Sequence, residues 1–236
     1  MDGLENAALI ALVAIVPLVV LTLTSFVKVS VVLSLLRNAI GAPDAPSGLI
    51  VMGLSLVLTF FVMAPVAVDM VQAAAGPSAP QQPGPPQPAP EPPAPSTDRS
   101  VEAALRMIVP AQYQPQLAAA QRAVEPLRAF LAKHTRDADR ETFASLAKKL
   151  GSSGSGEELW VLAPAFITTE LREAFVIAIL IFIPFLVIDL VVGLGLASLG
   201  LQSTSPQTIA LPLKLVLFVA VDGWRLLIDA LLRGYA

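Results

Sequence analysis

The sequence has 236 residues, of which 55% are hydrophobic and only 14% are charged. Soluble domains average about 45–50% apolar and about 25% charged residues, so this composition excludes a disordered chain and a conventional secreted domain. The formal net charge of −3 offers no positive field for phosphate and excludes a nucleic-acid binder. The absence of cysteine excludes a disulfide framework and thiolate chemistry. The composition therefore predicts a membrane protein, or one that buries apolar surface against partner subunits.

The charged residues are concentrated in the middle of the chain. Of 15 basic and 18 acidic residues, twenty lie between Asp98 and Glu173, seven precede this segment and six follow it. Together with the proline content, this pattern predicts four segments. They are an N-terminal apolar helical hairpin (1–75), a proline-rich linker (76–97), a polar helical middle domain (98–173), and a C-terminal apolar hairpin with an amphipathic tail (174–236).

The N-terminal segment predicts two helices with a short connection. Its first uncharged stretch, Ala7–Val27, has 21 residues, which as a helix spans about 30 Å, enough to cross a bilayer core. Asp2 and Glu5 precede it with no basic residue, a pattern that argues against a cleavable signal peptide. The apolar pattern continues to Leu36, and after a turn-rich connection a second uncharged stretch covers residues 49–68.

The linker and the middle domain have distinct patterns. Ten of the twenty residues from 76 to 95 are proline, which favours an extended polyproline II spacer. We interpret this run as a linker insertion, and a ligand for a proline-binding module is the alternative. Between residues 124 and 150 apolar side chains recur at spacings of three and four, which predicts amphipathic helices.

The C-terminal segment predicts a second hairpin. An apolar stretch begins at Ala174, contains Asp189 and ends at Leu201, and a second apolar arm surrounds Lys214. A charge at the centre of a membrane helix costs about 2.5–3.5 kcal/mol, so such residues usually face other helices and pair. We therefore expect Asp189 and Lys214, on the two arms, to form an ion pair between helices or between subunits.

Prolines and small residues further favour helices that pack against other helices. Proline removes a backbone donor and kinks a helix, and the predicted kinks are at Pro17, Pro65, Pro184 and Pro212. Small residues allow close approach of two helices, and the predicted packing positions are Gly193, Gly195, Ala197 and Gly200.

Catalysis is not expected from these residues. The intramembrane aspartates lack the surrounding motif of an aspartyl protease, and His134 is the only histidine. One imidazole without cysteine supports neither a histidine-based metal site nor a nucleophilic triad. No phosphate-binding glycine loop is present. We therefore expect no enzymatic activity, no metal and no cofactor.

Five stretches resemble a known family. They are LTSFVKVSVVLSLLRNAIG (23–41), LTFFVMAPV (58–66), PLRAFLAKHTRDADRETF (126–143), PFLVIDLVV (184–192) and IALPLKLVLFVAVDGW (209–224). Together they are similar to the type III secretion export-apparatus proteins of the SctR family, also called YscR or HrcR, whose flagellar counterpart is FliP. The resemblance covers nearly the whole chain in order, outside the proline-rich insert.

The resemblance implies an all-α subunit of a helical ring. In this family five copies assemble with SctT-like and SctS-like subunits into the entry gate for unfolded proteins that leave the bacterial cytoplasm. The assembly belongs to the inner membrane, at or above its periplasmic side, and most apolar hairpin surface is buried in it. The resemblance also implies that the pair of Asp189 and Lys214 joins adjacent subunits. The missing signal peptide resembles the virulence branch more than the flagellar one.

The chain departs from the family at the expected pore gate. The family carries three methionines after the glycine that matches Gly200, and they close the pore. Here these positions are Leu201, Gln202 and Ser203. We hypothesise a gate at the same turn, in which Leu201 supplies an apolar ring and Gln202 supplies hydrogen bonds.

Two other functions fit the residues taken alone. One is a lipid-embedded four-span transporter or channel subunit. The other is a membrane-anchored adaptor whose proline-rich segment binds a partner.

Overall fold

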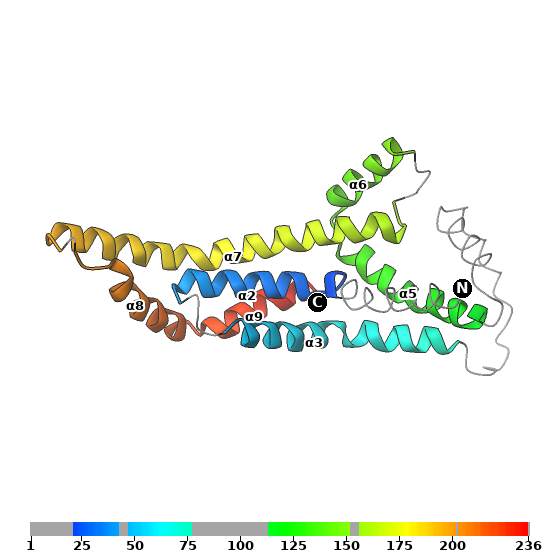
Figure 1. The fold of residues 1–236 in the computed structure, drawn as a ribbon, viewed down its shortest axis with the longest axis horizontal. Coiled ribbons are helices and arrows are strands. Elements are labelled where there is room, and N and C mark those ends of the chain that lie inside the picture. The colour runs from blue at the N-terminus through cyan, green and yellow to red at the C-terminus, as the bar shows by residue number, and fades with distance from the viewer. Residues whose placement is uncertain (1–20, 43–46, 77–112, 152–155, 202, 236) are drawn as a thin grey trace, which may run out of the picture. The chain divides into compact units, whose positions relative to one another are not determined.

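The computed structural model describes residues 21–42, 47–76, 113–151, 156–201 and 203–235 (Figure 1). Over these residues the protein is helical and contains no β-strand, so the predicted all-α class is confirmed. The helices are α2 (Phe26–Ile40), α3 (Gly48–Ala75), α5 (Gln114–His134), α6 (Asp137–Lys149), α7 (Leu159–Ser198), α8 (Pro206–Ala220) and α9 (Gly223–Arg233). The chain divides into two compact units, one from 1–62 and 170–236 and the other from 63–169, so α3 and α7 contribute to both.

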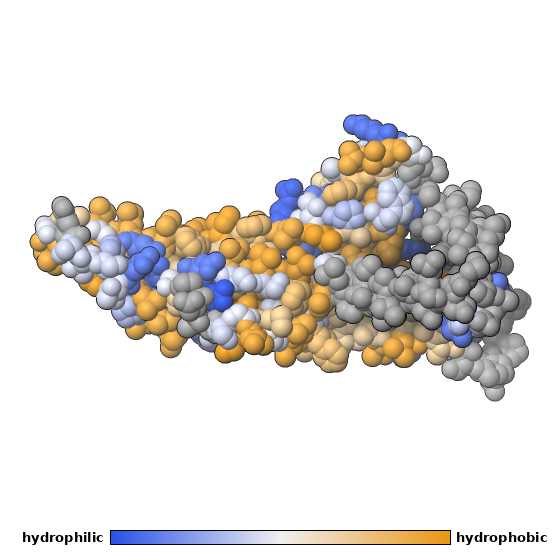
Figure 2. Space-filling model, viewed as in Figure 1, coloured by the Kyte–Doolittle hydropathy of each residue, from blue (hydrophilic) through white to orange (hydrophobic). Residues whose placement is uncertain are grey.

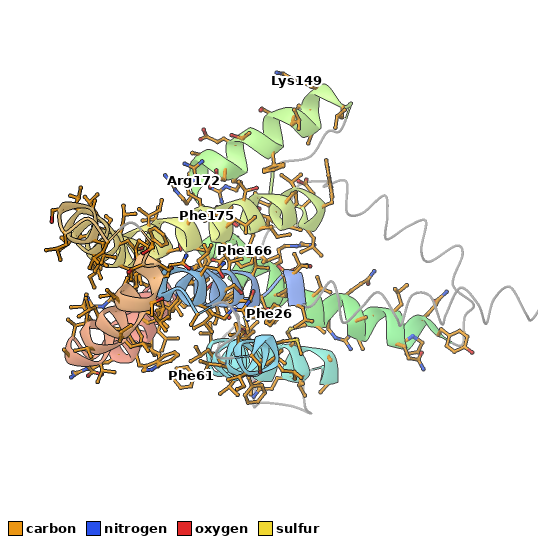
Figure 3. All side chains as sticks on the ribbon, turned by 60° about the vertical axis from the view of Figure 1, so that its left-hand side comes forward. Phe26, Phe61, Lys149, Phe166, Arg172 and Phe175 are labelled. Atoms are coloured by element: carbon orange, nitrogen blue, oxygen red, sulfur yellow. The ribbon has the colours of Figure 1, made fainter. Side chains whose placement is uncertain are left out.

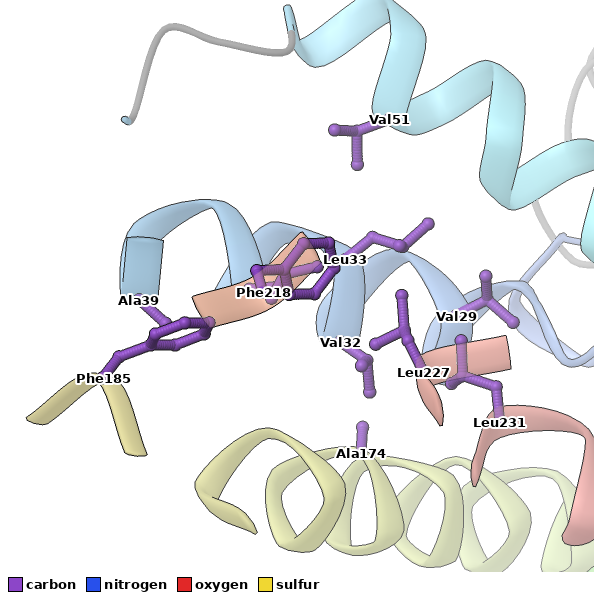
Figure 4. Close-up of a cluster of buried hydrophobic side chains, with 11 residues drawn as sticks. Val29, Val32, Leu33, Ala39, Val51, Ala174, Phe185, Phe218, Leu227 and Leu231 are labelled. Carbon is purple, nitrogen blue, oxygen red and sulfur yellow. The ribbon is translucent and has the colours of Figure 1, made fainter. Parts of the chain in front are cut away.

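The core of the first unit forms around α2. Val29, Val32, Leu33, Leu36 and Ala39 of this helix are buried against side chains of α7, α8 and α9. In Figure 4, Val32 points toward Ala174 of α7, and Ala39 lies beside Phe185 of the same helix. The earlier residue of α2 meets the earlier residue of α7, and the later residue meets the later one. Helix α2 and the part of α7 from Ala174 to Phe185 therefore run side by side and parallel.

The first apolar stretch does not continue unbroken into α2. The sequence predicts apolar helical character from Ala7 through Leu36, but the structure places a turn at 23–25. The Thr24 hydroxyl donates to the Leu21 carbonyl at 3.0 Å and accepts from the Phe26 amide at 3.4 Å. A threonine side chain that bonds to nearby backbone competes with the helix ladder, which explains the break. Residues 7–20 of the predicted stretch lie outside the described residues.

Helix α7 crosses the composition boundary at 173/174 without interruption. It contains 40 residues, about 60 Å at 1.5 Å per residue, and it continues through Pro184. Its first part belongs to the polar segment that the sequence predicts, and its remainder is the apolar arm. The four predicted segments thus stay a prediction based on composition, and residues 77–97 of the linker lie outside the described residues.

Helices α8 and α9 complete the first unit. Pro206 occupies the first turn of α8, where its missing amide is not needed. The predicted amphipathic tail is α9, in which Leu227 and Leu231 share one buried face. Between the two helices Asp222 adopts φ 52° and ψ 51°, the left-handed region that aspartate tolerates better than most residues.

The second unit contains the polar helices that the sequence predicts. Phe130 of α5 packs against Phe166 of α7 with ring centroids 5.9 Å apart. The Thr169 hydroxyl donates to the buried Asp139 carboxylate at 2.8 Å and accepts from the Arg136 amide at 3.2 Å. These bonds tie the start of α6 to α7.

Much apolar surface remains uncovered within one chain. Helices α3 and α7 are long and apolar enough to cross a membrane, and hydrophobic colour dominates the visible surface of α7 (Figure 2). Phe61 of α3 and Phe175 of α7 are 68% and 51% exposed, and many side chains of α7 extend from the ribbon in the same way (Figure 3). Such a surface requires lipid or further subunits.

The close packing of α8 on α9 gives a direct test. A Cβ at Gly223 would stand 2.3 Å from the Phe218 ring, so Gly223→Ala is expected to lower the free energy of unfolding by about 1–3 kcal/mol. The matched control is Gly193→Ala inside α7, where no atom lies within 4 Å of the added Cβ. That control should gain about 0.5–1 kcal/mol from helix propensity. Thermal unfolding in detergent measures both, and equal midpoints would contradict the packing of Phe218 on Gly223.

Candidate functional site

The structure brings Asp189 and Lys214 together within one chain. The Lys214 Nζ atom lies 2.7 Å from Asp189 Oδ2, and the two side chains are 6% and 40% exposed, respectively. The pair joins α7 to α8, the two arms of the C-terminal hairpin. A lysine this deeply buried needs a partner, since an unpaired buried charge costs several kcal/mol. A contact of the same residues between subunits stays a prediction.

Lys214 has a second acceptor on α2. Its ammonium group donates to the Ala39 carbonyl at 3.0 Å. Ala39 lies in the last turn of α2, where the carbonyls lack partners inside the helix, and a cation is favourable beside the negative end of the helix dipole. Gly41, with φ 89°, ends α2 here and bonds back to Asn38. One lysine thus fixes α7, α8 and the end of α2 to one another.

A second buried charge cluster lies toward the start of α2. Lys28 is 1% exposed, and its Nζ atom lies 3.1 Å from Glu170 and 2.7 Å from Glu173 on α7. The same ammonium group lies 4.0 Å from the centre of the Tyr235 ring, a favourable cation–π position. The Tyr235 hydroxyl donates to Glu170. The C-terminal segment therefore covers a buried lysine between α2 and α7.

The tyrosine remains a hydrogen-bond donor at physiological pH. Burial and the charge of Glu170 raise the pKa of the Tyr235 phenol far above its ordinary value, so the hydroxyl stays protonated. The adjacent Gly234 leaves room for the cluster, since a Cβ there would stand 3.2 Å from the Lys28 ammonium.

Only one member of this cluster stands out in the sequence. Lys28 is conspicuous as a single charge in an apolar stretch. Glu170 and Glu173 lie at the edge of a charged segment and look like solvent-facing residues there. Their spacing of three places both on one helix face, and this spacing beside an apolar stretch is the signal that could have found them.

The predicted gate residues lie in the turn between α7 and α8. Leu201 is 47% exposed and Ser203 is exposed, whereas Gln202 lies outside the described residues. The Leu201 amide donates to the Leu196 carbonyl, and the Gly200 amide donates to the Ala197 carbonyl. This pair of bonds is a Schellman motif, and it requires the left-handed conformation that Gly200 adopts at φ 71°.

Among the described residues, the small residues predicted to pack make no close contact. No atom lies within 4 Å of a Cβ built at Gly193, Gly195 or Gly200, and Ala197 is exposed. Gly200 therefore has a conformational role inside the chain, and close packing at these positions stays a prediction for contacts between copies.

Of the prolines, Pro65, Pro184 and Pro212 lie inside α3, α7 and α8, which each continue on both sides. Pro17 lies outside the described residues, and the kinks stay a prediction.

His134 contacts an aromatic side chain. It lies at the end of α5 and is partly buried, with its ring 4.5 Å from that of Phe130. The described part of the chain contains no group of three histidine, aspartate or glutamate side chains arranged for a metal ion. The geometry of the site thus consists of ion pairs that join helices, and of an exposed apolar turn.

Comparison with known proteins yields a consistent group of relatives. A sequence profile described as the FliP family matches residues 9–91 and 92–231. The flagellar biosynthetic protein FliP of Pectobacterium carotovorum subsp. carotovorum is 38% identical over 234 residues, which cover 99% of this chain and 79% of that protein. The pathogenicity-related ORF2 of Xanthomonas campestris pv. glycines is 37% identical over 231 residues, which cover 96% and 94% of the two chains. The hypersensitivity response secretion protein HrcR of Ralstonia nicotianae is 34% identical over 243 residues, which cover 100% of both.

The unequal burial of the first ion pair predicts unequal effects of mutation. Asp189→Ala leaves the buried Lys214 ammonium without a counter-ion and should cost about 3 kcal/mol, the low end for broken buried pairs. Lys214→Met leaves the half-exposed Asp189 solvated and should cost about 1–2 kcal/mol through the lost bond to Ala39. The control is Asp229→Ala, which breaks an exposed pair with Arg233 and should change stability by less than about 0.5 kcal/mol. Denaturant unfolding in detergent measures the order, and a larger effect of Lys214→Met would contradict it.

The second cluster predicts a rescue by a double substitution. Lys28→Met leaves the buried Glu170 carboxyl group without its cation, so it should cost about 3–5 kcal/mol. Lys28→Met with Glu170→Gln removes both charges and should recover most of that loss. The measurement is the unfolding free energy of Lys28→Met, Glu170→Gln and the double variant, with Glu173→Gln as the partly exposed comparison. Additive losses in the double variant would show that Lys28 and Glu170 do not interact.

Proposed function

This chain belongs to the FliP family, and from that membership we propose that it is a pore-forming subunit of a type III protein export apparatus, which conducts unfolded proteins out of the bacterial cytoplasm. The observation that carries the proposal is similarity along the whole chain to proteins named for flagellar biosynthesis and for hypersensitivity-response secretion. We propose no enzymatic activity, and the energy for transport comes from other parts of the machine.

The distribution of charge and apolar surface supports an assembled state. Lys28 and Lys214 have acidic partners inside the chain, so these charges are neutralised without a neighbour. The exposed surface of α7 is apolar over much of the length of the helix. We propose that copies of this chain cover part of it in a ring of five, with SctT-like and SctS-like subunits. The proposed location is the inner membrane, in the apparatus core at or above its periplasmic side.

Helix length argues against the four-span transporter. A span of a bilayer core needs about 20 residues, and α8 has 15. Two helices in the described part of the chain pass the length and hydropathy test. The adaptor alternative rests on the proline-rich segment, most of which lies outside the described residues, and no described contact favours it.

We place the proposed gate at the turn between α7 and α8. Leu201 follows a left-handed glycine, and its amide is bonded back to the end of α7, so its position is fixed relative to that helix. Five copies of Leu201 around an axis would form an apolar constriction that excludes ions by dewetting. Gln202 and Ser203 would add hydrogen bonds at the same level.

Stoichiometry tests the proposed assembly. Native mass spectrometry of the detergent-extracted full chain, expressed with SctT-like and SctS-like subunits, should give a five-copy ring, alone or with two small hydrophobic subunits. A monomer or dimer would favour the transporter alternative. A soluble protein held through the proline-rich segment would favour the adaptor.

Ion leakage tests the gate. Leu201→Gly removes the apolar side chain from the turn, so it should raise ion conductance through the assembled complex. Thr204→Gly is the matched control, because it loosens the same turn outside the three proposed gate positions. Conductance in planar bilayers measures both variants, and an unchanged value for Leu201→Gly would remove Leu201 from the gate.

A further inference from the structure

An apolar groove lies between α7, α8 and α9. Its volume is about 300 Å³, which is at the lower end of the range for ligand pockets. Pro184 and Phe185 of α7, Phe218 of α8, and Leu227 and Ala230 of α9 are among its lining residues. The walls are almost entirely apolar, and the groove opens to the surface.

A charged pocket adjoins this groove. It is lined by Asp222, Arg225, Asp229 and Arg233, and it shares Val221 and Leu226 with the groove. The surface therefore changes from apolar to charged across two common residues. A ligand that spans both parts must itself be apolar at one end and charged at the other.

One acidic and one basic side chain of this pocket are available to a ligand. Arg233 and Asp229 form an ion pair at 2.6 Å. Among the described residues, the side chains of Asp222 and Arg225 have no hydrogen bond or ion pair. Both are exposed and lie three positions apart at the start of α9. The pocket thus offers one carboxylate and one guanidinium to a ligand of zero net charge.

We propose that this surface binds a zwitterionic phospholipid with a primary ammonium headgroup. One acyl chain occupies the apolar groove, the phosphate accepts hydrogen bonds from Arg225, and the ammonium donates to Asp222. Arginine binds phosphate through two parallel bonds. Trp224, which is 46% exposed beside these residues, is a residue type enriched at the membrane–water boundary.

The proposal rests on the membrane location in the proposed function, and lipid retention tests it. The full chain, extracted in detergent, is mixed with equal amounts of phosphatidylethanolamine, phosphatidylcholine and phosphatidylglycerol, and retained lipid is measured by native mass spectrometry. Phosphatidylethanolamine should be retained most. Arg225→Gln, a change on the surface, should weaken retention of all three about tenfold, the loss expected for one charge-assisted bond. Asp222→Asn keeps a residue that tolerates the left-handed backbone, and it should abolish only the preference for phosphatidylethanolamine.

Two further variants test the groove itself. Ala230→Phe fills the groove and should abolish retention, whereas Ala220→Phe, at an exposed position outside both linings, should not. Because the chain contains no cysteine, Ala230→Cys is the only site at which a disulfide can join two copies. Equal retention of the three lipids, no retention by the unmodified chain, or a disulfide dimer in membranes would overturn the proposal. The same spectra report stoichiometry, so a ring without lipid contradicts this proposal alone, and a lipid-bound monomer contradicts the ring alone.

Discussion

The structure of the first unit depends on one constraint, that a lysine buried among apolar helices must have a partner. Lys28 lies near the start of α2 and bonds to two glutamates of α7. Lys214 bonds to the carbonyl of Ala39 near the end of α2 and to Asp189 of α7. Helix α2 is therefore tied to α7 at both ends. Apolar contacts alone would allow α2 to slide by a turn, whereas a slide would now leave the buried Lys28 ammonium unpaired and would break the bond of Lys214 to Ala39.

The structure distinguishes the apolar surface that is buried inside the chain from the apolar surface that is exposed on it. The two buried lysines inside the apolar segments are paired within the chain, and much of the outward face of α7 is apolar. A soluble protein rarely exposes so large an apolar area. The exposed apolar area is therefore the surface that is available to lipid and to neighbouring subunits. The low charge content thus reflects two environments, a paired interior and an apolar exterior.

The sequence predicts the presence of the helices better than it predicts where they end and which side chains they bring into contact. Periodicity and uncharged length identify α3, α7 and α8, because these features report burial directly. The break before α2 escapes such reasoning because it depends on two hydrogen bonds of the Thr24 hydroxyl. Asp189 and Lys214 are conspicuous because each is isolated in an apolar stretch. Glu170 and Tyr235 are not, because one sits beside other charges and the other lies in a short terminal segment that has no periodicity.

The turn between α7 and α8 shows how one residue can carry a role that its pattern does not reveal. As a member of a run of small residues, Gly200 suggests helix packing, but its φ of 71° and the two bonds around it make it the residue that ends α7. A side chain at this position would strain the turn. The glycine holds Leu201 at a fixed place after the helix whatever the following residues are. If the proposed gate opens, Leu201 must therefore move with the end of α7.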